Sequence, residues 1–238
     1  MTVSRHLVET ITTNVRVVRE RIAAACDRAG RDPGTVRLVG ISKTFPMDYV
    51  RAGVEAGLTD LGENRVQEAL DKVEQSEDLE VTWHLVGHLQ SNKTRRAVVA
   101  MSWIHSVDSR ALLERLERTA SDEDTTAQVL VQVDLAGEAT KHGASVDETR
   151  AVLKTGASCR AIQIRGLMVI PPWSTDPEQT RPYFRRLAAL RDQLIADGTP
   201  STMLGQLSMG MSHDFEVAIE EGATMVRVGT AIFGSRSR

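Results

Sequence analysis

Lysine, arginine and small hydroxyl residues follow or interrupt the apolar segments of this sequence. Lys43 comes directly after the apolar run 38–42, and Arg227 lies inside another such run. Segments 208–212 and 229–230, rich in Gly, Ser and Thr, end the last two runs. A lysine at the end of a buried strand can act as a nucleophile, and small residues let backbone N–H groups approach a phosphate. The pattern predicts amine chemistry beside a phosphate site.

Each of these features also has a purely structural interpretation. Partial burial at a strand end would lower the pKa of the Lys43 amine and favour attack. Position alone favours an ion-paired or surface-extended lysine instead. The two small-residue segments could be tight packing with Ser212 as a helix cap. Loops after the last two strands of an α/β barrel, however, recurrently bind phosphate, and here both loops carry the pattern.

Arg227 places a charge in the middle of an apolar strand. A buried charge has to face a ligand or a carboxylate. Next to a bound aromatic ring, this guanidinium would donate to an acceptor nitrogen of the ring. An amine, a phosphate cradle and a partner for a ring nitrogen together bind pyridoxal 5′-phosphate. We therefore expect this cofactor, held as a Schiff base on Lys43.

Two other groups of polar residues predict no chemistry. His84 and His88 are four residues apart, but the residues between them form an apolar strand, so the imidazoles would not share a helix face. We expect no metal site. Ser212, His213 and Asp214 are adjacent, whereas a catalytic triad converges from distant positions. These three residues predict the start of a helix.

Composition excludes several classes of protein. The 238 residues are 41% hydrophobic and 26% charged, which is typical of a globular protein. There are 29 basic and 32 acidic residues and only 4% aromatic ones, which disfavours nucleic-acid binding. Cys26 and Cys159 form no CxxC motif, and no segment matches a membrane span or a signal peptide. We expect a cytoplasmic protein that binds neither nucleic acid nor membranes.

Eight short apolar runs alternate with helical patterns. The runs cover residues 38–42, 60–62, 84–87, 103–106, 129–133, 164–169, 206–209 and 225–228. Helices are expected over residues 3–29, 48–56, 64–75, 91–100, 109–121, 146–156, 177–196 and 214–221. The alternation predicts one α/β domain over residues 1–238, a closed (β/α)8 TIM barrel with an extra N-terminal helix. An open doubly wound sheet is the alternative.

Several motifs, in order, resemble those of one family. They are GISKT (40–44), GENRVQE (62–68), WHLVGHLQSNK (83–93), GLM (166–168), LSMGMS (207–212) and VRVGTAIFG (226–234). The chain is similar over nearly its whole length to the pyridoxal phosphate homeostasis proteins, which are related to the N-terminal barrel of alanine racemase. One departure is Asp134, where the family pattern has asparagine.

The resemblance implies a fold-type III barrel with pyridoxal 5′-phosphate linked to Lys43. It implies phosphate contacts from the loop after the seventh strand and from the loop after the eighth. Arg227 would face the pyridine nitrogen, and Asn64 and Met168 would line the pocket. The expected cofactor-binding residues are Lys43, Asn64, Met168, Ser208, Met209, Ser212, Arg227, Gly229 and Thr230.

Racemisation needs a base on each face of the substrate carbon. In the racemases, a tyrosine from a second domain supplies one of them, and the only tyrosines here, Tyr49 and Tyr183, lie outside the motifs. We expect a monomeric carrier or regulator of intracellular pyridoxal phosphate without strong catalytic activity, which passes its cofactor to apo-enzymes in transient complexes. The alternatives are a small amino-acid racemase and a Schiff-base aldolase.

Overall fold

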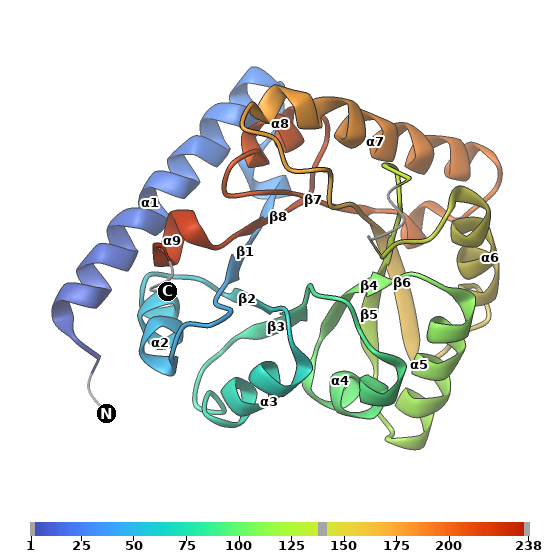
Figure 1. Ribbon diagram of the computed structural model, residues 1–238, viewed down its shortest axis with the longest axis horizontal. Coiled ribbons are helices and arrows are strands. Elements are labelled where there is room, and N and C mark those ends of the chain that lie inside the picture. Colours follow the sequence, from blue (N-terminus) through green and yellow to red (C-terminus); the bar gives the residue numbers. More distant parts are fainter. Residues whose placement is uncertain (1–2, 138–141, 236–238) are drawn as a thin grey trace.

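The computed structural model describes residues 3–137 and 142–235 and contains a closed barrel of parallel strands in sequence order (Figure 1). The last strand pairs with the first, with Leu38 opposite Val226. The strands are β1 Arg37–Ile41, β2 Asp60–Glu63, β3 Thr82–Leu85, β4 Trp103–Val107, β5 Ala127–Gln132, β6 Ile162–Met168, β7 Gln206–Met211 and β8 Met225–Val228. The predicted barrel is confirmed, and the open sheet is wrong.

Helices form a ring outside the strands (Figure 1). They are α1 Arg5–Arg28, α2 Met47–Glu55, α3 Val66–Glu74, α4 Thr94–Ala100, α5 Arg110–Asp122, α6 Val146–Gly156, α7 Arg181–Ala196, α8 Phe215–Glu220 and α9 Thr230–Phe233. The predicted segments 91–100 and 177–196 each begin with a 3-10 turn rather than an α-helix. The short helix α9 was not predicted, because a single turn shows no periodicity.

Strand ends lie within two residues of the predicted ones, and β8 matches the prediction at both ends. The largest shift is in the third strand, which runs over Thr82–Leu85 rather than 84–87. Its register explains the shift: Asp60 of β2 lies opposite Thr82, and Glu63 lies opposite Leu85. Pairing with the neighbouring strand determines where a strand begins and ends. The position of an apolar run in the sequence does not predict that pairing.

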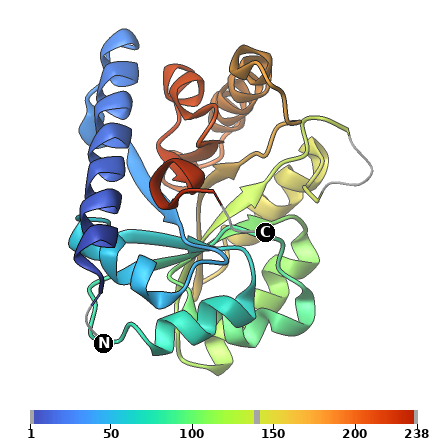
Figure 2. The same ribbon diagram turned by 60° about the vertical axis from the view of Figure 1, so that its left-hand side comes forward.

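The extra helix α1 packs along the outside of the barrel, beside α2, α8 and α9 (Figures 1 and 2). Its buried stripe is formed by Ile11, Val15, Val18, Ile22, Ala25 and Cys26. Polar contacts fix its position: Arg21 pairs with Glu216 of α8, and the Asn14 amide donates to the carbonyl of Ile232 in α9. None of the helices in the described ranges is long and apolar enough to cross a membrane.

The two faces of each strand contact different surroundings. Outward side chains such as Leu61, Ile104 and Leu207 join the main core between the sheet and the helices. Inward ones form small separate clusters, one of which contains Trp103, Leu130, Met168 and Met225. Polar and charged residues fill much of the remaining barrel interior, and they include His84, His105, Ser208 and Arg227. The inner face is therefore polar for a barrel of this type.

Close contact between β6 and β7 requires glycine at position 166. A Cβ atom there would lie 1.8 Å from the backbone oxygen of Gln206, whereas at Gly205 the nearest atom, the Ser201 oxygen, is 3.9 Å away. We expect Gly166→Ala to lower the free energy of unfolding by at least about 2 kcal/mol. Gly205→Ala, the matched control, should change it by less than about 0.5 kcal/mol. Urea denaturation measures both, and equal effects would contradict this account of the β6–β7 contact.

Candidate functional site

The predicted site residues lie along one arc of the barrel mouth. Met168 ends β6, Ser208 and Met209 are in β7, Arg227 is in β8, and Lys43 and Asn64 follow β1 and β2. Strands β6, β7, β8, β1 and β2 are consecutive neighbours in the closed sheet. The carboxyl ends of these parallel strands meet at one side of the mouth, so residues far apart in sequence are brought together.

Lys43 lies in a tight turn directly after β1. The Phe45 N–H donates to the Ser42 carbonyl over 3.0 Å, which closes the turn around Lys43 and Thr44. Thr44 has φ 69°, a left-handed conformation that a β-branched residue rarely adopts. Its backbone N–H donates to the Glu68 carboxylate at the start of α3. Such strain persists only where the surroundings enforce it. Here the contact with Glu68 holds the strained backbone next to Lys43 in place.

A buried ion pair supports this turn from the outer side of the sheet. The Lys72 ammonium lies 2.7 Å from Glu63 Oε1 and donates to the Ser42 carbonyl over 2.8 Å. The Ser42 hydroxyl donates to the same Glu63 oxygen over 2.6 Å. Burial raises the pKa of Glu63, and the contacts with Lys72 and Ser42 oppose that shift. Losing Lys72 would leave the Glu63 charge unpaired in the core, whereas Lys72 also lies 3.2 Å from Glu68, so the group of charges anchors the end of β1.

The loops after β7 and β8 are joined by one hydroxyl. Ser212 Oγ accepts hydrogen bonds from the backbone N–H groups of Gly229, over 3.1 Å, and Ala231, over 3.4 Å. A Cβ atom at Gly229 would lie 3.2 Å from the Ile41 carbonyl, so glycine allows β8 to approach the end of β1. The two small-residue loops and the Lys43 turn are therefore adjacent.

Arg227 is buried and points into the barrel. Its guanidinium donates to Ser208 Oγ over 2.6 Å and to the Val169 carbonyl over 2.9 Å. Burial lowers the pKa of Arg227 to about 10, while the Asp214 carboxylate opposes the shift, so the group is still charged at neutral pH. A planar guanidinium has more donors than these two bonds use, and a ring nitrogen at the mouth is a suitable acceptor.

A chain of hydrogen bonds runs from Arg227 through the barrel interior. Ser208 Oγ lies 2.9 Å from His105 Nδ1, and His105 Nε2 lies 3.0 Å from His84 Nδ1. His84 Nε2 lies 3.0 Å from Asp60 Oδ1, which also pairs with Arg37 over 2.9 Å. The chain connects the site at the mouth to the opposite end of the barrel, where β1 and β2 begin.

The direction of donation along this chain follows from its two ends. A carboxylate only accepts, so His84 donates to Asp60 through Nε2 and accepts at Nδ1. His105 then donates through Nε2 and accepts the Ser208 hydroxyl at Nδ1, while Ser208 accepts from Arg227. Burial lowers the pKa of His84 and lowers the pKa of His105 well below its usual range, so both rings are neutral.

The remaining predicted residues differ in their surroundings. Asn64 is half-buried after β2, and Thr230 is exposed at the start of α9. Met168 is buried in the inner cluster, on the same side of the sheet as Ser208. The side chain of Met209 points away from the barrel interior into the main core, so only its backbone is available for the predicted cofactor contact. β7 alternates its side chains, so an inward Ser208 requires an outward Met209.

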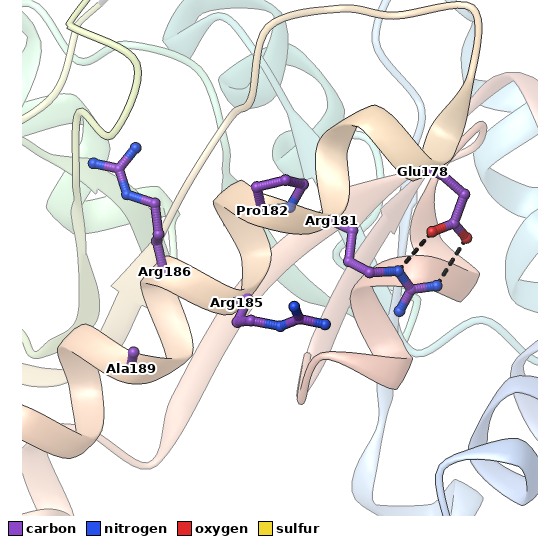
Figure 3. A pocket seen from close by; sticks show the side chains of 6 residues that line it. All are labelled: Glu178, Arg181, Pro182, Arg185, Arg186 and Ala189. Carbon is purple, nitrogen blue, oxygen red and sulfur yellow. Dashed lines mark hydrogen bonds and ion pairs between the residues drawn. The ribbon is translucent and has the colours of Figure 1, made fainter.

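A depression on the outer face of α7 is rich in arginine but lies away from the barrel mouth (Figure 3). It is lined by Glu178, Arg181, Pro182, Arg185, Arg186 and Ala189. The Arg181 guanidinium pairs with Glu178, Glu220 and Glu221. Arg185 also pairs with Glu221, and Arg186 donates to the Leu135 carbonyl, so most of this surface is an ion-pair network rather than an anion site.

The residues at the mouth fit pyridoxal 5′-phosphate. Glycine at position 229 keeps β8 close to the end of β1, and the Ser212 hydroxyl, which accepts two backbone N–H bonds there, still has its own proton to donate to a phosphate. Lys43 follows the neighbouring strand β1, and Arg227 supplies a donor for a ring nitrogen. These groups match the phosphate, the aldehyde and the ring of the cofactor.

Comparisons with known proteins assign the family. Residues 9–237 match the alanine racemase N-terminal domain. The chain is 44% identical over 219 residues to the pyridoxal phosphate homeostasis protein of Aquifex aeolicus, covering 92% of this chain and 95% of that protein. The chain belongs to the pyridoxal phosphate homeostasis proteins of the alanine racemase N-terminal domain family.

Solved structures agree with this assignment. PipY of Synechococcus elongatus, solved with pyridoxal phosphate bound, is 41% identical, with a TM-score of 0.81 over 91% of this chain and all of PipY. A protein from Bifidobacterium adolescentis has a TM-score of 0.89 at 36% identity, covering 98% of both chains. Alanine racemase from Clostridium difficile shares the fold, with 13% identity and a TM-score of 0.74, and the match covers 97% of this chain and 58% of the racemase.

Sequence reasoning missed most members of the interior chain. Asp60, His84, His105 and Arg37 were not assigned to the site. Polar residues at alternate positions of apolar strands were the available signal, because alternation places them all on one face. Lys72 was also missed, although it follows Val66 and Ala69 at three-residue spacing on the buried stripe of α3.

The two neutral histidines make stability depend on pH. Both imidazoles have pKa values below the usual 6.5 in the folded state, so only the unfolded chain takes up these protons. Their contribution to the free energy of unfolding is complete above pH 6.5. It is lost as the pH falls below 6.5, by up to about 1.4 kcal/mol per pH unit for each ring.

We expect His105→Gln to weaken this dependence, because the amide preserves one donor and one acceptor without titrating. The free energy of unfolding, measured in urea at pH 7.5 and 5.5, should fall less in the variant than in the parent protein. His6→Gln, at an exposed histidine, is the control, and its free energy of unfolding should fall between these pH values as much as that of the parent protein. Equal losses in all three proteins would contradict the neutral, buried state of His105.

Proposed function

We propose that this protein binds pyridoxal 5′-phosphate and acts as an intracellular carrier or regulator of the cofactor, without strong catalytic activity. The observation that carries the proposal is the convergence of the Lys43 turn, the Ser212–Gly229 contact and Arg227 on one arc of the mouth. The names of the curated relatives and the cofactor bound to PipY support the same ligand.

Each part of the arc has one task in this proposal. Lys43 supplies the amine that links to the aldehyde carbon of the cofactor. Ser212, Gly229 and Thr230 hold the phosphate: the hydroxyls of Ser212 and Thr230 donate to it, and Gly229 lets the backbone lie close to it. The Arg227 guanidinium donates to the pyridine nitrogen, and Asn64 and Met168 complete the walls around the ring.

Arg227 also favours binding over turnover. The bound cofactor supplies an electron sink whose strength depends on a protonated pyridine nitrogen, and a donor that remains charged keeps that nitrogen unprotonated. Racemisation further needs a second base. Tyr49 packs on Phe45, with ring centroids 4.8 Å apart, and Tyr183 lies on α7 against the main core. Both tyrosines therefore have structural surroundings rather than those of a catalytic base.

A carrier has to release what it binds. The proposed partners are apo-enzymes that depend on the same cofactor, contacted transiently by a monomer of this protein in the cytoplasm. Lys43 and the phosphate loops lie at the barrel mouth, where an acceptor site can approach the linked cofactor.

Lys43 can be tested directly by spectroscopy. The purified protein loaded with pyridoxal phosphate should be yellow, and borohydride should shift its visible band and fix the cofactor on the peptide containing Lys43. Lys43→Ala should lose the band and the fixed adduct, whereas the exposed Lys154→Ala should keep both. A reducible band in Lys43→Ala would disprove the assignment, and a colourless parent protein would favour the aldolase alternative.

Carrier and racemase differ in what the loaded protein does. We expect single enantiomers of amino acids to keep their optical purity during incubation with the holo-protein. We also expect an apo-enzyme to gain activity faster when it is mixed with the holo-protein than when it is mixed with an equal concentration of free cofactor. Rapid loss of optical purity that is abolished in Lys43→Ala would overturn the carrier assignment.

A further inference from the structure

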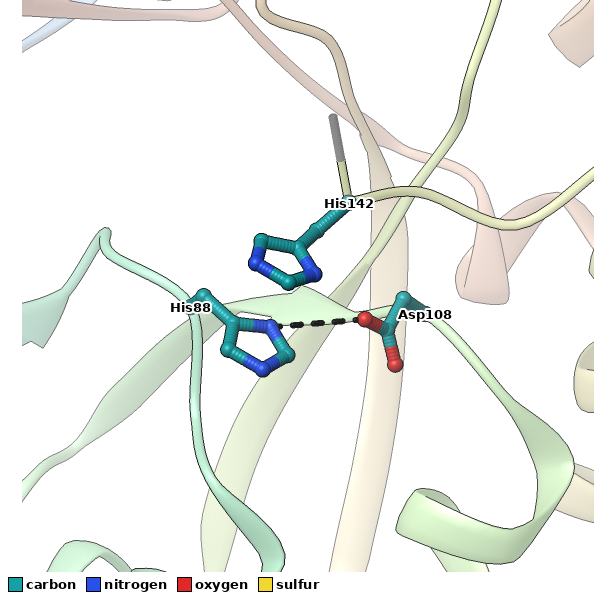
Figure 4. Close-up of side chains that lie close together, drawn as sticks. All are labelled: His88, Asp108 and His142. Atoms are coloured by element: carbon teal, nitrogen blue, oxygen red, sulfur yellow. Dashed lines mark ion pairs between the residues drawn. The ribbon is translucent and has the colours of Figure 1, made fainter. Parts of the chain in front are cut away.

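The second arc of the barrel mouth carries a separate group of ligating side chains. His88 follows β3, Asp108 follows β4, and His142 lies in the loop after β5 (Figure 4). One ligand atom from each of these residues lies within 4.8 Å of the others. Strands β6, β7, β8, β1 and β2 carry the proposed cofactor residues and form the cofactor arc of the mouth. Strands β3, β4 and β5 lie outside it, so this group needs an explanation of its own.

We propose that His88, Asp108 and His142 bind a divalent transition-metal ion of the zinc class. Two imidazole nitrogens and one carboxylate oxygen are a donor set that zinc favours, and three protein ligands leave a position for water or an exchangeable anion. The inference is independent of the proposed cofactor function.

The distance between His88 and Asp108 supports a shared ion. His88 Nδ1 and Asp108 Oδ2 are 3.5 Å apart, longer than a charge-assisted hydrogen bond of about 2.7–2.9 Å. Two donors bound to one tetrahedral zinc at roughly 2.0–2.1 Å stand about 3.4 Å apart. Two of the ligands therefore already have the spacing that the ion requires.

The third ligand has to move only by side-chain rotation. The imidazoles of His88 and His142 are stacked, with centroids 3.6 Å apart and an angle of 8° between the rings. Parallel rings cannot both aim a nitrogen at one ion, so one of them has to tilt. His142 is exposed and can tilt without disturbing the core.

The backbone fixes where these side chains start. The carbonyl of His142 accepts a hydrogen bond from the Gln132 amide over 2.5 Å, and Ala144 makes a bridge to Val133 that ties the loop to the end of β5. A Cβ atom at Gly87 would lie 2.2 Å from the Asn64 oxygen, so the chain before His88 is held against the loop after β2.

Asp108 is directed toward the same point. The neighbouring residue Ser109 caps α5 by accepting a hydrogen bond from the Leu112 N–H, so Asp108 is not needed as a cap. Its carboxylate points toward His88 instead (Figure 4). Three ligands on three anchored loops form a site that a metal ion can close with small movements.

The test is titration of the tag-free, chelator-treated protein with zinc chloride, followed by calorimetry and by elemental analysis after gel filtration. We expect one zinc ion per chain. His88→Ala, His142→Ala and Asp108→Asn should each weaken binding about tenfold or more, since even outer partners of metal ligands contribute that much. His6→Ala, an exposed histidine on α1, should bind zinc like the parent protein.

Pyridoxal phosphate itself chelates metals, so Lys43→Ala provides the second arm. Zinc binding that persists in Lys43→Ala but is lost in His142→Ala assigns the ion to the cluster, whatever becomes of the cofactor proposal. Cobalt bound to Lys43→Ala should give a visible spectrum with no cofactor band beneath it. The proposal is overturned if no stoichiometric zinc binds, or if the cluster variants, folded by circular dichroism, bind it as tightly as the parent.

Discussion

The interior of the barrel depends on the buried charge of Arg227. Removing a guanidinium from water is costly, and here its acceptors are a hydroxyl and a carbonyl, with Asp214 attracting it from further away. The hydroxyl of Ser208 accepts this bond and donates its own proton to His105. Each member of the chain satisfies the next until Asp60 is reached. A barrel filled with branched aliphatic side chains could not hold this charge.

The buried ion pair of Glu63 and Lys72 has a different role from Arg227 because it lies on the other face of the sheet. Glu63 and Lys72 are between β2 and α3, outside the barrel, and they contact Ser42 directly before the lysine. The interior chain positions the group that would face the cofactor ring, and the outer pair positions the turn that would hold its aldehyde carbon. Both faces of the sheet therefore fix the same small site.

The sequence predicted those features that depend on local patterns. Apolar runs and helical periodicity identified the barrel, and the Gly–Ser–Thr segments identified the loops joined by Ser212. It did not predict which way Met209 points or which residues satisfy Arg227. Those depend on register and on contacts between distant strands, as between Ser208 and His105, and periodicity in one strand carries no such information. The shifted ends of β3 have the same origin.

The two arcs of the mouth differ in how firmly their polar groups are held, and this difference bears on function. On the cofactor arc, Arg227 is buried and fixed by a chain of partners, so it would offer a donor of fixed direction to the ring of the proposed cofactor. On the other arc, His142 is exposed and can rotate toward a ligand. A fixed donor suits a cofactor whose electronic state must stay constant during storage. Rotatable imidazoles suit an exchangeable ion, since binding then needs no rearrangement of the core.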